Sequence, residues 1–354
     1  MRQDSPSAPV FVSRFPPILR MYSRQKPIAA CRLTPERPVT ADIENRFLQI
    51  RVAHYARSVN GARSVEWDIE RDVLRGRSLD FSRKFLPDGL SLIDRLEFLR
   101  PAEALRLSQL QGRTYAALLA RLERVIGATV LLRARVQVFD DRTAVESLVR
   151  FANDELKHRE LFRRLELLMG EGMPAGYALH ANTLQFATGM LDRSAWSLLA
   201  LACQVELVAQ AHYEQAFESH DDLCPLFKDV FRFHGLDERQ HALLDELEWT
   251  AVHNAITKAE RDQAVDDFIA LIANFDRVLR AQARADADYY LRTSDRRFSG
   301  IEASCLESTL LAATRWQFIV SGMQHVHFRH VLTSLTTVEQ RARITAALQS
   351  VSQA

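Results

Sequence analysis

The sequence has few residues that break helices. It contains 12 glycines and 11 prolines in 354 residues, and its last proline is Pro225. Long stretches rich in Ala, Leu, Arg and Glu carry apolar residues at helical spacing, which is typical of an all-α protein. The sequence therefore predicts helices near 41–59, 62–76, 91–110, 112–138, 141–169, 194–219, 225–256, 261–291, 302–332 and 336–350.

Excess charge, paired cysteines and long apolar runs are also missing. With 46 basic and 45 acidic residues the net charge is +1, so no overall field favours nucleic acid or an anionic membrane, and we expect neither partner. Cys31, Cys203, Cys224 and Cys305 form no closely spaced pair, which favours reduced thiols in a cytoplasmic protein. No apolar run reaches the roughly 18 residues that span a bilayer.

The first 40 residues differ in composition from the rest. They are rich in arginine and proline and lack the apolar centre of a secretory signal. We expect residues 1–40 to form an extended arm or a loosely ordered tail, and residues 41–354 to form a single helical domain.

Two similar motifs stand out in the helical part, DELKH at Asp154–His158 and DERQH at Asp237–His241. They are 83 positions apart. A random chain of this composition would hold roughly 0.2 copies of acid-acid-x-x-His. Two copies, both Asp-Glu-x-x-His, therefore indicate a duplicated functional element.

Each motif also has a glutamate 32 residues ahead of its own: Glu123 precedes Glu155, and Glu206 precedes Glu238. In a helix, residues three apart share one face, so the Glu and His of each motif project together. The midpoints between the paired glutamates, Phe139 and Asp222, fall in turn-like sequence.

The pattern therefore predicts two antiparallel helical hairpins that each deliver Glu plus Glu-x-x-His at matching depth. This is the inward-facing arrangement of four-helix di-metal carboxylate proteins. The glycine-rich segment 169–183 would form the long crossover between the hairpins, which places the bundle core at about 112–256. The extra N- and C-terminal helices would surround it.

These residues resemble the ferritin-like di-iron carboxylate superfamily and, within it, the p-aminobenzoate N-oxygenase family. That family has the duplicated Glu and Asp-Glu-x-x-His pattern and a further histidine four residues before the second motif glutamate. His234, in FHGLDERQH, stands at this position, whereas the first motif has Phe151 there. The resemblance covers roughly 112–254 and implies a ferritin-like four-helix bundle.

The ligand set favours a site for two metal ions. Four carboxylates with two or three imidazoles suit iron or manganese, and the lack of nearby thiolates argues against an iron–sulfur cluster or structural zinc. We expect two iron ions, with manganese as the second choice of metal. The expected ligands are Glu123, Glu155, His158, Glu206, His234, Glu238 and His241.

The resemblance implies an O2-dependent di-iron oxygenase that oxidises the nitrogen of a small-molecule amine, with an aromatic amine as one candidate. Hydroxylation or desaturation of carbon is a second enzyme reaction open to such a centre. Two further functions from different classes stay open: a ferritin-like protein that oxidises or stores iron, and a bundle that has lost its activity and serves as a scaffold. No nucleotide-binding fingerprint occurs, so we expect a separate electron donor. The flanking helices would carry substrate selectivity and subunit contacts, such as those of a homodimer.

Residues around the ligands have expected roles as well. Asp154 and Asp237 are rotated about 100° from the ligand stripe, and each could accept the ring N–H of the histidine from the other motif. Residues near the ligands could line the substrate pocket, with Gly127 leaving room for substrate or O2. These pocket candidates are Gly127, Cys203, Gln210 and Tyr213. We do not expect a second metal site at His325, His327 and His330, because they have no carboxylate companion within their own motif.

Overall fold

The computed structural model describes residues 55, 66–139, 141–180 and 189–353, all within the unit Pro35–Ala354. Within these ranges the chain is helical and holds no strand, apart from an isolated bridge between Lys84 and Leu223. The all-α class is therefore confirmed. The arm expected at residues 1–40 lies outside the described residues, and the single domain expected at 41–354 stays a prediction. None of the described helices is long and apolar enough to cross a membrane.

The chain up to the end of the first helix pair begins with short elements and continues with two long helices. They are the π-helical turn η3 (Ile69–Leu74), α2 (Asp88–Ser91), the 3₁₀ turn η4 (Ile93–Arg95), α3 (Pro101–Gln137) and α4 (Arg142–Gly172). The second pair consists of α6 (Ala195–His212), which continues into the π-helical turn η6 (Tyr213–Phe217), and α7 (Pro225–Ala255). The C-terminal part comprises α8 (Lys258–Thr293), α9 (Gly300–Arg315), the π-helical turn η7 (Trp316–Val320), α10 (Ser321–Gln324), α11 (Val326–Leu335) and α12 (Val338–Gln353).

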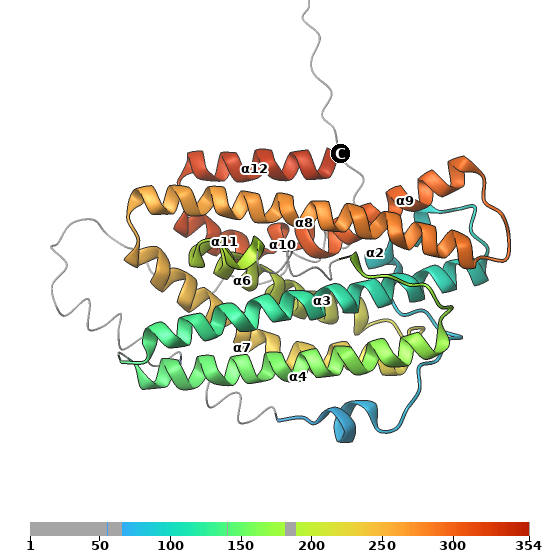
Figure 1. Ribbon diagram of the computed structural model, residues 1–354, viewed down its shortest axis with the longest axis horizontal. Helices are drawn as coiled ribbons and strands as arrows, with labels where there is room; N and C mark the ends of the chain where they lie inside the picture. The colour runs from blue at the N-terminus through green and yellow to red at the C-terminus, as the bar shows by residue number, and fades with distance from the viewer. Residues whose placement is uncertain (1–54, 56–65, 140, 181–188, 354) are drawn as a thin grey trace, which may run out of the picture. The chain divides into compact units, whose positions relative to one another are not determined.

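Four of these helices form the centre of the fold. Helix α3 packs along α4, α6 packs along α7, and the pairs meet through contacts of α3 with α6 and of α4 with α7 (Figure 1). Helix α6 is buried along nearly its whole length because α3, α7 and α8 all pack on it. The turns fall where the sequence predicts them, around Phe139 and Asp222.

Local sequence explains where the central helices start. Pro101 and Pro225 occupy the first turns of α3 and α7, where a missing N–H costs nothing. The Asp141 side chain accepts hydrogen bonds from the backbone N–H groups of Thr143 and Ala144 and so caps α4. Apolar residues at steps of three and four then bury one face of α4, including Phe151, Phe162 and Met169.

The helix boundaries predicted at 91–110 and 112–138 are wrong, because α3 is continuous from Pro101 to Gln137. Gly112 lies inside the helix, where a Cβ atom would come within 2.6 Å of the Phe85 Cβ. Glycine therefore allows close packing here and does not end the helix. The predicted helix at 62–76 is reduced, within the described residues, to the turn Ile69–Leu74.

The single helix predicted at 302–332 is interrupted twice, by the π-helical turn η7 and by a break at His325. The Gln204 side chain reaches across from α6 and donates hydrogen bonds to the carbonyls of Phe318 and Ile319. Gly322 leaves room for this side chain, since a Cβ atom there would lie 2.4 Å from Gln204 Nε2. A side chain from a distant helix thus binds two carbonyls of the π-helical turn.

Candidate metal centre

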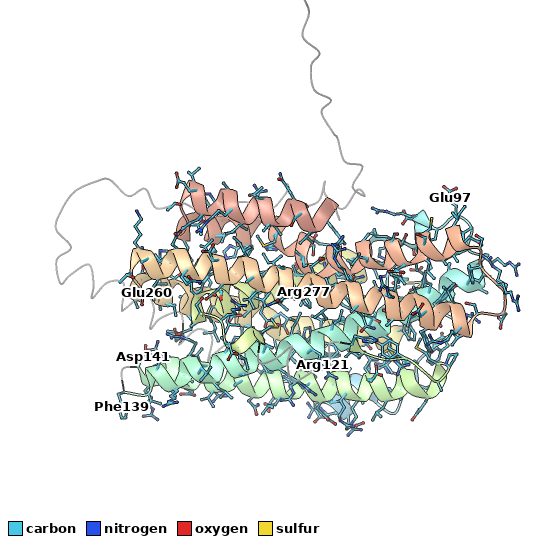
Figure 2. The ribbon with its side chains drawn as sticks, turned by 45° about the horizontal axis from the view of Figure 1, so that its top comes forward. Glu97, Arg121, Phe139, Asp141, Glu260 and Arg277 are labelled. Carbon is cyan, nitrogen blue, oxygen red and sulfur yellow. The ribbon has the colours of Figure 1, made fainter. Side chains whose placement is uncertain are left out.

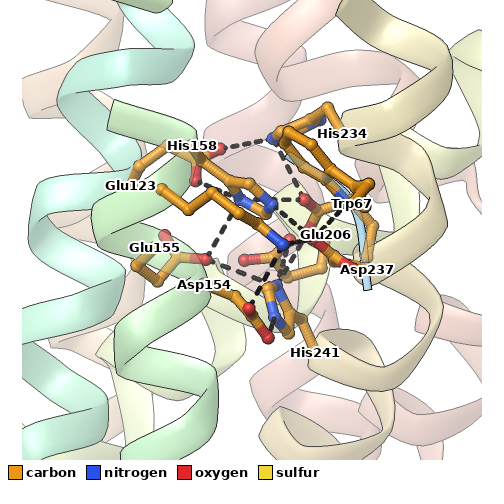
Figure 3. Close-up of polar contacts among 11 residues, drawn as sticks. Trp67, Glu123, Asp154, Glu155, His158, Glu206, His234, Asp237 and His241 are labelled. Carbon is orange, nitrogen blue, oxygen red and sulfur yellow. Dashed lines mark hydrogen bonds and ion pairs between the residues drawn. The ribbon is translucent and has the colours of Figure 1, made fainter. Parts of the chain in front are cut away.

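The duplicated motif residues meet in the interior of the four central helices. Helix α3 supplies Glu123, α4 supplies Glu155 and His158, α6 supplies Glu206, and α7 supplies the remaining three (Figure 3). At most 2% of each side chain is exposed. The structure thus brings together all seven expected ligands, which are Glu123, Glu155, His158, Glu206, His234, Glu238 and His241.

One half of the site contains two histidines. His158 Nδ1 lies 3.1 Å from Glu123 Oε2 and 3.4 Å from Glu238 Oε1. His234 Nε2 lies 2.8 Å from Glu123 Oε1 and 3.0 Å from Glu238 Oε1. The ligand atoms of these four residues are within 4.8 Å of one another, so they could hold one ion.

The other half has one histidine. His241 Nδ1 lies 3.3 Å from Glu155 Oε1, 3.3 Å from Glu238 Oε2 and 4.0 Å from Glu206 Oε2. Two overlapping groups here could hold a metal ion, one with Glu155, His158 and His241 and one with Glu206, Glu238 and His241. Glu155 and Glu238 each approach both motif histidines, so these two carboxylates lie between the halves.

Many polar atoms in this cluster form no hydrogen bond. Both carboxylate oxygens of Glu155, Glu206 and Glu238, and both ring nitrogens of His241, are buried without one, although several of them lie within ion-pair distance of one another or of His234. A buried polar group left unpaired costs about 1–3 kcal/mol, and native proteins rarely tolerate such a concentration. Burial, with the neighbouring charge of Glu123, also raises the pKa of Glu155 well above its ordinary value. Cations would satisfy these atoms, and a carboxylate and imidazole donor set fits iron or manganese.

The two aspartates of the motifs contact the histidines of the opposite motif. His158 Nε2 lies 3.0 Å from Asp237 Oδ2, within hydrogen-bonding distance, and His241 Nε2 lies 3.6 Å from Asp154 Oδ2. This is the crossed arrangement expected from the sequence, but only the pair of His158 and Asp237 is within hydrogen-bonding distance. Because Nε2 faces an aspartate in each case, Nδ1 is directed at the glutamates, which fixes the orientation of the rings.

Lys157 and Trp67 are parts of the site that the sequence analysis missed. Lys157 Nζ lies 2.9 Å from Asp237 Oδ2 and 3.3 Å from Asp154 Oδ1, so one cation joins the two aspartates. The Trp67 indole N–H donates to Asp237 Oδ2 at 3.0 Å, and its ring lies 4.0 Å from the lysine nitrogen and parallel to the His158 ring. The motifs offered one clue to Lys157, because the two copies differ at this position: the first has lysine and the second has Gln240. Trp67 precedes the duplicated region, and nothing in the pattern marked it.

The four pocket candidates lie in three different surroundings. The space beside Gly127 is taken by Glu155, whose Cβ would lie 3.2 Å from an added Cβ, so this glycine allows α3 and α4 to approach. Cys203 is buried, with its Sγ 3.9 Å from the Ala242 carbonyl. Gln210 and Tyr213 line an outer cavity of about 490 Å³ on the seam of α6, η6 and α7, which none of the seven ligands lines.

The C-terminal histidines have a carboxylate neighbour that the sequence did not indicate. His327 Nε2 lies 2.7 Å from Glu246 Oε2. Among the residues that the structure describes, every group able to hold a metal ion belongs to the centre described above.

Comparison with known proteins adds no relative to this picture, because no protein-family model, curated protein or solved structure matches the chain. The site geometry and the sequence motifs are therefore the basis for a functional assignment.

Proposed function

We propose that this protein is an O2-activating di-iron oxygenase that oxidises the nitrogen of a small-molecule amine. The observation that carries the proposal is the buried cluster of four glutamates and three histidines, in which three glutamates and His241 have orphaned polar atoms. We further propose that α3–α4 and α6–α7 are the two hairpins of a ferritin-like bundle, joined by the crossover between Gly172 and Ala195.

The two halves of the site would each hold one ion. Glu123, His158 and His234 would bind the first ion, and Glu206 and His241 the second. Glu155 and Glu238 approach both motif histidines and would help to hold the ions. Iron bound by these residues would supply the two-electron chemistry of O2 activation, which no amino-acid side chain supplies alone.

The protein itself would orient the ligands and exclude water. The Phe151 ring stacks on His241 at a centroid distance of 3.9 Å, and Phe162 packs edge-on against His234 at 5.0 Å. Trp67 covers His158 and binds Asp237. These rings lower the local dielectric, which strengthens the charge–charge interactions inside the site.

The choice of nitrogen as the oxidised atom depends on the resemblance to the p-aminobenzoate N-oxygenase family. His234 is the residue that supports it best, because it stands at the position of that family's third histidine. In the structure it faces Glu123 and Glu238, within hydrogen-bonding distance of both. It gives one half of the site a nitrogen that the other half lacks.

Product analysis tests this function. The protein is loaded anaerobically with two equivalents of ferrous ion and supplied with p-aminobenzoate, a reductant and ¹⁸O2. We expect an N-oxygenated product that carries the label, and no product from the Glu238→Ala variant. Label on ring carbon alone would assign the protein to carbon hydroxylation. Iron oxidation without any organic product would point to iron handling.

A further inference from the structure

Three arginines gather on the outer side of α3 and α4 without acidic partners. Arg121 and Arg124 come from α3 and Arg159 from α4, and no ion pair joins any of them to a carboxylate among the described side chains. The Nε atoms of Arg121 and Arg159 are buried without a hydrogen bond. Arg121 and Arg124 are three residues apart on α3, a spacing at which like charges destabilise a helix, so a bound anion would be favourable here.

Large exposed apolar side chains concentrate on the same two helices. Most such side chains of the described chain lie on the α3–α4 hairpin, namely Leu131, Leu132, Val136, Val138, Phe139, Val149, Leu156 and Leu167. On α4, Leu156 and Arg159 are three residues apart and share one face; on α3, Arg124 and Leu131 are seven apart and do the same. Figure 2 shows Arg121 between the two helices and Phe139 at the turn that joins them.

We call Arg121, Arg124, Arg159, Leu131 and Leu156 the α3–α4 face. On both helices the metal ligands lie on another side than the α3–α4 face. The residues of the face are nevertheless next to ligands in the sequence: Arg124 follows Glu123, Leu156 follows Glu155, and Arg159 follows His158. A helix with its side chains is about 10–12 Å across. The α3–α4 face is therefore separated from the metal centre by a single helix layer.

We propose that an acidic electron-donor protein docks on the α3–α4 face. This inference rests on the proposed function, because an O2-activating di-iron centre needs electrons from outside and the chain has no nucleotide-binding fingerprint. Each reduced donor would give up one electron, so two encounters would return two ferric ions to the ferrous state. Arginine and apolar side chains are enriched in protein interfaces, and acidic groups on the donor would pair with the arginines and speed association.

The charges argue against a second copy of this chain as the occupant. A two-fold dimer contact places the same patch of both subunits together, so the arginines of one copy would approach those of the other. Two such clusters repel each other. An acidic partner removes this repulsion.

A binding measurement with a defined probe tests the proposal without any need for iron in this protein. The probe is an oxidised plant-type ferredoxin, a small acidic [2Fe–2S] protein, titrated calorimetrically at low and at high salt. We expect binding that weakens with salt, and a loss of affinity of at least about tenfold in the Arg121→Gln/Arg124→Gln/Arg159→Gln variant. The matched control, Arg277→Gln/Arg284→Gln/Arg292→Gln, removes the same charge from exposed positions of α8 and should bind like the wild type.

Reduction kinetics separate this inference from the proposed function. Reduced ferredoxin should reduce the diferric wild type and the α8 control at the same rate and the α3–α4 variant at least about tenfold more slowly, while the small cation methyl viologen radical reduces all three alike. A centre that methyl viologen cannot reduce would count against the proposed function. Equal ferredoxin affinity in all three proteins, or no ferredoxin binding by the wild type, would overturn the docking surface. So would a wild-type dimer in sedimentation that the Arg→Gln variant loses, because a second copy would then occupy the face.

Discussion

Replacement of Glu206 by leucine should change stability in opposite directions with and without metal. The Glu206 side chain is 1% exposed, and neither of its carboxylate oxygens has a hydrogen-bond partner. Without metal, the apolar replacement removes an unpaired buried group and should stabilise the protein by about 1–3 kcal/mol. In a chain of this size that raises the melting temperature by roughly 1–4 °C.

With saturating ferrous ion the sign should reverse. Loss of a direct ligand weakens binding of its ion by at least about 100-fold, since even partners behind the ligands are worth 10–100-fold. This corresponds to at least about 2.7 kcal/mol of lost stabilisation by bound metal, which exceeds the metal-free gain over all but the top of its range of about 1–3 kcal/mol. The Glu206→Leu variant should therefore melt above the wild type in chelator and below it in ferrous ion, as measured by anaerobic scanning calorimetry.

Glu248 provides the matched control. This carboxylate is equally buried, but it accepts hydrogen bonds from Tyr55, Arg133 and Gln137. The Glu248→Leu variant leaves the Arg133 charge without its partner and should lose about 3–5 kcal/mol in both conditions. If Glu206→Leu also destabilised the metal-free protein, Glu206 would be an ordinary structural carboxylate and the reasoning from orphaned atoms would fail.

Three further predictions concern residues around the centre. His234→Ala should still bind two ions but react with O2 at a changed rate, and an unchanged rate in stopped-flow measurements would remove His234 from the ligand set. Lys157→Gln should leave Asp154 and Asp237 to repel each other. The affinity for ferrous ion, measured by competition with a chelator, should therefore fall about tenfold, and tighter binding would contradict this role of Lys157. Burial raises the pKa of Asp286 from 3.8 to about 7. Because the folded protein then keeps a proton that the unfolded chain releases, the free energy of unfolding should fall by up to about 4 kcal/mol as pH rises from 4 to 7. In urea unfolding, the free energy of unfolding of the Asp286→Asn variant should not show this fall with pH. The same pH dependence in the variant and the wild type would refute the role of Asp286.

The ligand cluster was predictable from the sequence because it obeys helix geometry twice. A fixed offset of 83 residues relates the two halves, and each Glu-x-x-His step places two side chains on one face. The same geometry turned Asp154 and Asp237 away from the ligands and toward the opposite histidines. These inferences needed only the helical repeat and an antiparallel arrangement of the hairpins.

Other features depended on contacts between distant segments. The role of Lys157 becomes visible only when α4 and α7 bring both aspartates to one ammonium group. The predicted break between 110 and 112 is wrong because α3 runs through it; Gly112, which costs about 1 kcal/mol inside a helix, packs closely against Phe85 there. Two further contacts also join distant segments: Trp67 binds Asp237 of α7, and the Gln204 side chain of α6 binds a carbonyl of η7.

The number of ferrous ions bound per chain tests the central claim most directly. An anaerobic ferrous titration of the metal-free protein, followed by calorimetry and metal analysis after desalting, should give two ions per wild-type chain. The Glu155→Ala/Glu238→Ala variant, which lacks both glutamates between the halves, should bind neither ion tightly. One ion or none in the wild type, or two ions in this variant, would contradict the assignment of a two-metal centre.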